Sequence, residues 1–190
     1  MKNSLLLALF VSTLALFAGA QDNRDAISPK GIDRITKEVR HELVMLPYYG
    51  VFDNLAYKVD PDGTVTLLGQ VSRPTLKSDA ENSVKRIEGV EKVVNDIEVL
   101  PASINDDRIR RDVYKAIYGN DVLSMYQLRA VPPIHIIVKN GNVTLEGVVS
   151  RSLEKAVATM QANHVSGVFS VTNNLHTEEE DKPAKKVDKK

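Results

Sequence analysis

The sequence contains no cysteine. Disulfide bonds, thiolate nucleophiles, cysteine-ligated metal sites and an acyl anchor on an N-terminal cysteine are therefore excluded for these residues. An excess of charge of either sign is also missing, because 25 Lys and Arg residues balance 25 Asp and Glu residues. Bulk charge thus gives no reason to expect nucleic acid as a partner. The hydrophobic content of 43% is sufficient for a packed core.

The motifs of common enzyme classes are missing as well. There is no G-x-S-x-G nucleophile elbow and no G-x-x-x-x-G-K-[ST] phosphate loop. No two histidines have the i, i+4 spacing of a helical metal site. We therefore expect no enzyme activity, no catalytic residue, no metal and no cofactor. The histidines are His41, His135, His164 and His176.

Residues 1–20 have the three-part pattern of a secretory signal peptide. Lys2 precedes an apolar stretch, and Ala18-Gly19-Ala20 is a small-x-small cleavage signature. The alternative is a transmembrane anchor, but the apolar stretch has about 13 residues whereas roughly 20 are needed to span a bilayer. We expect cleavage near Ala20 and export to the periplasm, with a peripheral position on a membrane as a further expectation.

The chain contains an internal repeat. Residues 63–73 (GTVTLLGQVSR) recur as residues 141–151 (GNVTLEGVVSR) at an offset of 78, and the match continues without a gap to Asn95 and Asn173. Upstream the offset is 74, so the second copy carries four extra residues between its first helix and its first strand. Two tandem copies of one module are therefore expected.

Each copy is expected to have the order helix, strand, strand, helix, strand. Hydrophobic residues recur at helical spacing in the helices and alternate in the strands. This order predicts an α+β fold with two tandem αββαβ modules, each a small three-stranded sheet covered by two helices on one face. In the first copy the expected elements are a helix (33–46), two strands (56–59 and 64–71), a helix that starts near Pro74 and ends at Gly89, and a strand (90–100).

The repeat divides the chain into six parts. The last part is almost free of apolar residues, so we expect it to be disordered. The parts are a signal peptide (1–20), an N-terminal linker (21–32), a first module (33–101), a linker (102–106), a second module (107–177) and a charged tail (178–190).

Two glycine and valine patterns stand in register in the copies. The first is Gly63-x-Val65-x-Leu67-x-Gly69-x-Val71 with Gly89-Val90-x-x-Val93-x-Asn95, and the second is Gly141-x-Val143-x-Leu145-x-Gly147-x-Val149 with Gly167-Val168-x-x-Val171-x-Asn173. Over about residues 33–177 the chain resembles the BON domain (bacterial osmotically induced and nodulation) family. The resemblance implies αββαβ modules, often in tandem behind a signal peptide. It also implies non-enzymatic envelope proteins that associate with phospholipid membranes and respond to osmotic or envelope stress.

Four glycines are expected to be structural rather than ligand-binding. Gly69 and Gly147 fall within strands, where a missing side chain allows close approach of a helix or backbone. Gly89 and Gly167 fall at expected helix ends, where glycine most readily adopts positive φ.

Charge is shared unevenly between the copies. Residues 33–101 hold 9 Lys/Arg and 12 Asp/Glu, a net charge of −3, whereas residues 106–177 hold 8 and 6, a net charge of +2. The second copy is therefore the better candidate for binding anionic phospholipid headgroups. Burial of Ile109, Val113 and Ile117 in its first helix would leave cationic and tyrosine side chains facing outward. The apolar region that follows is expected either to insert shallowly into lipid or to extend the core.

The alternatives to a headgroup-binding face are that the basic residues are only solvated and that Tyr114 or Tyr118 packs on the other copy. For function, the alternative to lipid binding is a periplasmic chaperone-like stress factor with other envelope proteins as partners. The candidate lipid-binding residues are Arg108, Arg110, Arg111, Tyr114, Lys115, Tyr118, Leu123, Met125, Tyr126 and Arg129.

Overall fold

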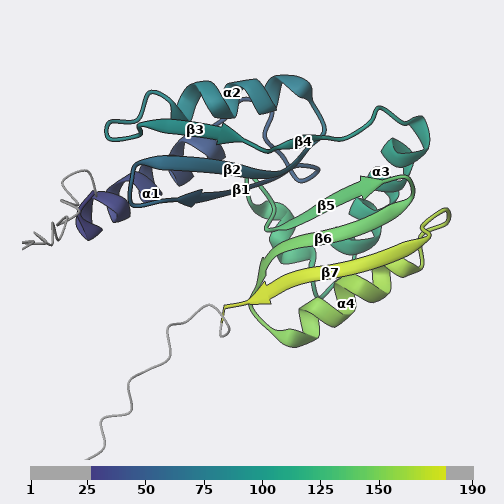
Figure 1. Cartoon of the computed structure of the whole chain (residues 1–190). Helices are drawn as coiled ribbons and strands as arrows, with labels where there is room; N and C mark the ends of the chain where they lie inside the picture. Colours follow the sequence, from purple (N-terminus) through teal and green to yellow (C-terminus); the bar gives the residue numbers. More distant parts are fainter. Residues whose placement is uncertain (1–26, 179–190) are drawn as a thin grey trace, which may run out of the picture.

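The structure, a computed structural model, describes residues 27–178. They form two α+β modules in tandem, the first coloured purple to teal and the second teal through green to yellow in Figure 1. The expected signal peptide lies outside the described residues, and so does the charged tail from residue 179 onward.

The first module contains two helices and a mixed sheet. Strand β1 runs antiparallel to β2, while β3 and β4 both run parallel to β2 on its other side. The elements are α1 (Pro29–Val44), β1 (Asn54–Val59), β2 (Thr64–Val71), α2 (Pro74–Val84), β3 (Lys92–Asn95) and β4 (Glu98–Val99).

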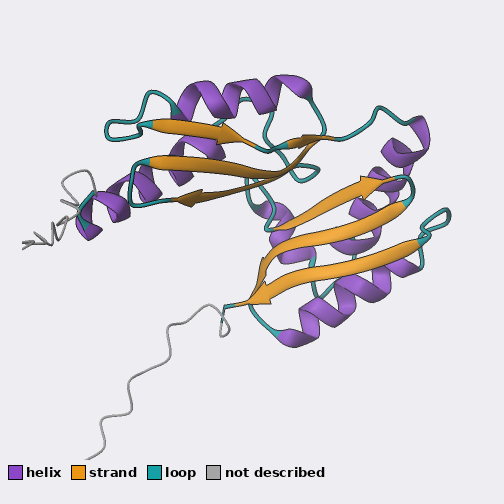
Figure 2. Cartoon of the chain, viewed as in Figure 1, coloured by secondary structure: helices purple, strands orange, loops and turns teal. Residues whose placement is uncertain are grey.

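The second module repeats this arrangement and adds one short helix (Figure 2). Its sheet has the order β5-β6-β7, with β5 antiparallel and β7 parallel to β6. The elements are α3 (Ile104–Tyr118), the 3₁₀ helix η1 (Ser124–Leu128), β5 (Ile134–Lys139), β6 (Asn142–Val149), α4 (Ser152–Asn163) and β7 (Ser170–Thr177).

The predicted α+β fold of two αββαβ modules is confirmed. Alternate residues of β2, among them Val65 and Leu67, are fully buried and pack with Ile35 and Val39 of α1 in the first core. The second module has a core of its own around α3, α4 and its sheet. In each module the sheet and two amphipathic helices thus bury their apolar faces together.

Some boundaries differ from those expected. Helix α1 begins at Pro29, because the Ser28 hydroxyl accepts a hydrogen bond from the Gly31 amide (3.2 Å) and proline fits the first helical position. Helix α3 likewise begins at Ile104, with Ser103 as its N-cap. The expected strand 90–100 is interrupted between β3 and β4 without a change of register.

The loop between α1 and β1 joins the two modules. The Ile136 amide of β5 donates a hydrogen bond to the Val51 carbonyl (2.7 Å). Tyr49 stacks on His135 with ring centroids 5.6 Å apart. Because this loop reaches the edge of the second sheet, the first module contributes side chains to a surface of the second.

Candidate functional site

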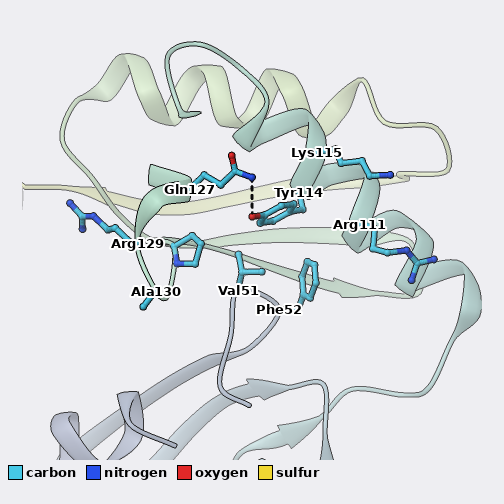
Figure 3. Close-up of a pocket in the computed structure, with 9 residues that line it drawn as sticks. Val51, Phe52, Arg111, Tyr114, Lys115, Gln127, Arg129 and Ala130 are labelled. Carbon is cyan, nitrogen blue, oxygen red and sulfur yellow. Dashed lines mark hydrogen bonds between the residues drawn. The ribbon is translucent and has the colours of Figure 1, made fainter. Parts of the chain in front are cut away.

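A pocket of about 570 Å³ lies where the two modules meet. Figure 3 shows side chains from the first module's loop rising toward side chains from α3 and from the segment around and after η1. We call it the junction pocket. It is lined by Val51, Phe52, Arg111, Tyr114, Lys115, Gln127, Arg129, Ala130 and Pro132.

Tyr114 lies at the centre of the junction pocket (Figure 3). Its ring meets Phe52 edge-on at 6.2 Å and lies 4.8 Å from the ring of Tyr118. The amide of Gln127 donates a hydrogen bond to its hydroxyl at 3.4 Å. Tyr114 therefore packs against Phe52 of the first module, which matches the alternative expectation that it packs on the other copy. Aromatic rings in such pairs add to the stability of the contact beyond their buried area.

Three cations border the junction pocket, Arg111 and Lys115 on one side and Arg129 on the other (Figure 3). Arg111 forms no ion pair within residues 27–178. The Lys115 side chain is 76% exposed and its amine lies 4.0 Å from an Asp112 oxygen. The Arg129 guanidinium lies over the Tyr126 ring at 5.6 Å. No carboxylate is among the lining residues, so the pocket combines an apolar floor with a cationic rim.

Two of the candidate residues on α3 are buried, and their assignment to an exposed lipid-binding face is wrong. Arg110 is 4% exposed, because its guanidinium pairs with Asp107 and donates a 2.7 Å hydrogen bond to the Val138 carbonyl. Tyr118 is 1% exposed, because its hydroxyl donates to the Ile134 carbonyl (2.7 Å) and accepts from the Ile134 amide (3.1 Å). Burial raises the pKa of the Tyr118 phenol far above its ordinary value.

The region holding the extra residues is divided between core and surface. Leu123 and Tyr126 are buried in the second core, so for these two residues the expected extension of the core describes their position and insertion into lipid does not. The Tyr126 hydroxyl donates to the Glu154 carboxylate at 2.7 Å, which fixes η1 against the start of α4. Met125 and Leu128 remain exposed, at 62% and 89%.

Arg108 is only partly available to a ligand. Its guanidinium donates to the Ser166 carbonyl (3.3 Å) and to the Asn105 side chain (3.1 Å). In the first module Arg34 makes the matching contact with the Glu88 carbonyl at 3.0 Å. A contact present in both modules serves the fold of each, so it does not distinguish the second module as a binding site.

Gly69 and Gly147 have φ values of 109° and 122°. A Cβ at either position would lie 2.1 Å from the Asn54 carbonyl oxygen or 1.9 Å from that of Pro133. Only glycine fits there, because the neighbouring strand's backbone passes too close for a side chain.

The other two glycines are placed differently from the sequence expectation. Gly89 and Gly167 lie in the turns after α2 and α4, several residues beyond the helix ends at Val84 and Asn163. Their φ values of 86° and 90° lie in the left-handed region, so glycine is still favoured.

Five lining residues were not identified from the sequence: Val51, Phe52, Gln127, Ala130 and Pro132. The one available signal was the apolar Val51-Phe52 pair in the connection that precedes β1. Within residues 27–178, no three His, Asp or Glu side chains gather as a metal site would require, and no helix has the length and apolar character needed to cross a bilayer.

The fold and the repeat define a tandem protein of small helix-covered sheets. The chain belongs to the BON domain family, whose sequence profile matches residues 32–101 and 105–179. It is 31% identical over 113 residues to the outer membrane lipoprotein DolP of Haemophilus influenzae. That match covers 60% of this chain, and the chain spans 58% of the length of this relative.

Solved structures of CdsD, a structural protein of the type III secretion system of Chlamydia trachomatis, also match. The C-terminal domain gives a TM-score of 0.31 at 14% identity, covering 76% of this chain and 64% of that one. A second CdsD structure gives 0.29 at 12% identity, covering 77% and 94%. TM-scores this low support no conclusion about this chain.

Proposed function

We propose that this chain is an exported, non-enzymatic protein of the cell envelope that binds anionic phospholipid headgroups at the junction pocket. The observation that carries the proposal is the set of three cations around an apolar floor that contains no carboxylate. A role in the response to envelope or osmotic stress is part of the proposal and is supported by membership of the BON family. A position in the periplasm is supported by the relative named as an outer membrane lipoprotein.

The chemistry of the pocket matches that of a headgroup. Arg111 and Lys115 would meet the phosphate, since cations near a membrane surface are attracted to anionic lipids. Tyr114 offers a ring and a hydroxyl, a combination suited to the depth of the headgroups. Val51 and Phe52 would contact the apolar part of the lipid next to the phosphate.

Vesicle sedimentation tests the proposal. The purified protein should sediment with phosphatidylglycerol vesicles more than with phosphatidylcholine vesicles, and added salt should weaken the binding. The double variant Arg111→Glu with Lys115→Glu should lose the binding. Unchanged sedimentation of this variant would remove the junction pocket as the contact.

Two matched controls sharpen this test. Lys37→Glu with Arg40→Glu makes the same change of net charge on α1, the equivalent helix of the first module, and should keep most of the binding. Tyr118→Phe changes a buried residue next to Tyr114 and should leave binding unchanged, because its hydroxyl faces Ile134. Co-purification with envelope proteins in the absence of lipid dependence would instead favour a protein-interaction or chaperone-like role.

A further inference from the structure

Phe169 is an exposed aromatic residue on the turn between α4 and β7. Its side chain is 80% exposed, although its ring lies directly over Gly141 in the turn between β5 and β6. Its amide donates a 2.9 Å hydrogen bond to the Gly141 carbonyl, so the backbone beneath the ring is fixed. A large apolar side chain is thus held in place on the surface with little of its area covered.

Ile104, the first residue of α3, is exposed at the same end of the module. Its side chain is 90% exposed. The Asp106 carboxylate in the same helical turn accepts hydrogen bonds from the amides of Asn140 (2.9 Å) and Gly141 (2.8 Å). The Phe169 ring also lies against Gly141, so the start of α3 and the α4–β7 turn both contact the turn between β5 and β6. All three lie at one end of the second module (Figure 1).

The first module lacks both apolar residues. At the offset of 78 the residue matching Phe169 is Glu91, and at the offset of 74 the residue matching Ile104 is Lys30. Both are exposed. The two modules share one fold, so the fold does not require an apolar side chain at either position. Apolar residues stand at both positions only in the second module, whose helix α3 borders the junction pocket.

One side of α3 connects these two residues to that pocket. Ile104, Arg108, Arg111 and Lys115 follow one another at spacings of four, three and four residues, which places them along one face of the helix. The face runs from the exposed apolar end of the module to the cations that border the junction pocket. An anionic surface drawn to Arg111 and Lys115 would therefore also meet the apolar end.

We propose that Phe169 and Ile104 form an apolar anchor that enters the interface of an anionic bilayer while the cations of α3 bind its phosphates. This inference rests on the proposed function and adds a second contact to it, in a different part of the module. Anchoring by both charge and apolar insertion is characteristic of proteins that lie on a membrane surface. The anchor would also fix which end of the second module faces the lipid.

Fluorescence of a single introduced tryptophan tests the anchor, because the chain contains no tryptophan of its own. On phosphatidylglycerol vesicles, the emission of Phe169→Trp should shift to the blue and be quenched by lipids brominated on their acyl chains. Leu68→Trp is the control, since Leu68 is 40% exposed on β2 of the first module and lies outside the loop that lines the junction pocket. Its emission should not change.

A second variant measures what the anchor contributes. Phe169→Glu with Ile104→Lys installs the residues of the first module and leaves the net charge unchanged, so any effect reports the apolar contact. Partitioning onto phosphatidylglycerol vesicles should fall about tenfold, as expected for exposing two large apolar side chains that had been partly buried in lipid. Circular dichroism should stay that of the wild type, because both side chains are exposed.

The outcomes separate the two proposals. Sedimentation of the wild-type protein, with an unshifted emission from the Phe169→Trp variant and full partitioning of the charge-neutral double variant, would overturn the anchor and leave the headgroup site standing. If the wild-type protein did not sediment with phosphatidylglycerol vesicles at all, both the headgroup site and the anchor would be overturned.

Discussion

The backbone amide of Ile136 donates a 2.7 Å hydrogen bond to the carbonyl oxygen of Val51, which links the edge of the second sheet to the first module. Strand edges carry unpaired amides that readily pair with another chain. Here part of the β5 edge is instead covered by the loop that also places Phe52 in the junction pocket. Docking of the modules and the shape of the pocket are therefore coupled.

Replacing Phe52 with Ala should loosen this junction. The change removes the edge-on contact with Tyr114 and part of the apolar floor, and should cost about 1–2 kcal/mol of docking free energy. Differential scanning calorimetry should show the unfolding of the modules becoming less cooperative, and vesicle binding should weaken. Leu68→Ala, in the same module but 40% exposed, is the control and should leave both unchanged. A Phe52→Ala thermogram identical to that of the wild type would contradict the coupling.

The junction should also respond to acid through His135. Burial lowers the pKa of this imidazole below its ordinary value of 6.5, although backbone contacts with Asp53 and Gly50 and the charges of Asp53 and Glu146 oppose the shift. A lowered pKa means that the docked state binds fewer protons than the separated state. Docking is therefore at full strength above pH 6.5 and weakens as the pH falls below it.

Chemical shifts of residues on both sides of the junction, followed from about pH 7.5 to about pH 5, would measure this effect across the range in which histidine titrates. His135→Gln should remove the dependence, because the amide stays neutral. His41→Gln changes an exposed histidine on α1 and should leave the dependence intact. A wild-type junction that is unaffected by pH in this range would rule out a role for His135 in docking.

Two glycines of the chain, Gly147 in β6 and Gly50 in the loop before β1, differ in how much space surrounds them. Gly147→Ala should destabilise the second module by about 3 kcal/mol or more, because the new Cβ would meet the Pro133 carbonyl oxygen at 1.9 Å and φ is 122°. Gly50→Ala should have little effect, since its nearest non-neighbouring atom would be 4.0 Å away and its φ is not in the left-handed region. Urea denaturation of the two variants measures the difference. Equal midpoints would show that the strand can move to accept the methyl group.

The sequence was sufficient to predict the modules because their signals are local. Alternation in β2 and β6, and the recurrence of Gly69 as Gly147, are visible without any knowledge of neighbouring elements. The helical periodicity of α3 correctly indicated that Ile109 and Val113 are buried.

The candidate site was harder to predict because burial at its borders depends on long-range contacts. A helical projection places Arg110 at the margin of the buried face and Tyr118 on the outward face. Both are buried because their side chains reach the carbonyls of Val138 and Ile134 on β5. Phe52 could not be assigned at all, because the way in which the modules dock is absent from the pattern of either one. Only Arg111, Tyr114, Lys115 and Arg129 of the expected lipid-binding residues line the junction pocket.

The extra residues of the second module are held by a polar pair that the first module lacks. The Tyr126 hydroxyl donates to Glu154 at 2.7 Å, and Glu154 also accepts hydrogen bonds from the amides of Ser150 (2.9 Å) and Arg151 (3.1 Å). At the offset of 78, the residue matching Glu154 is Leu76, which is buried in the first core. A carboxylate thus replaces a leucine where an inserted tyrosine is available to satisfy it.

A double-mutant cycle of Tyr126→Phe and Glu154→Gln should show an interaction energy of about 1–3 kcal/mol in urea denaturation. Burial alone would raise the pKa of Glu154, but the hydrogen bonds from Tyr126, Arg151 and Ser150 outweigh it and hold the pKa below its ordinary value of 4.5. The stabilisation is therefore present above pH 4.5 and lost as the pH falls through the lowered value. Tyr126→Phe should reduce this loss, whereas Tyr48→Phe, an exposed tyrosine in the first module, should not. Additive single-variant effects at neutral pH would show that η1 is held by its apolar contacts alone.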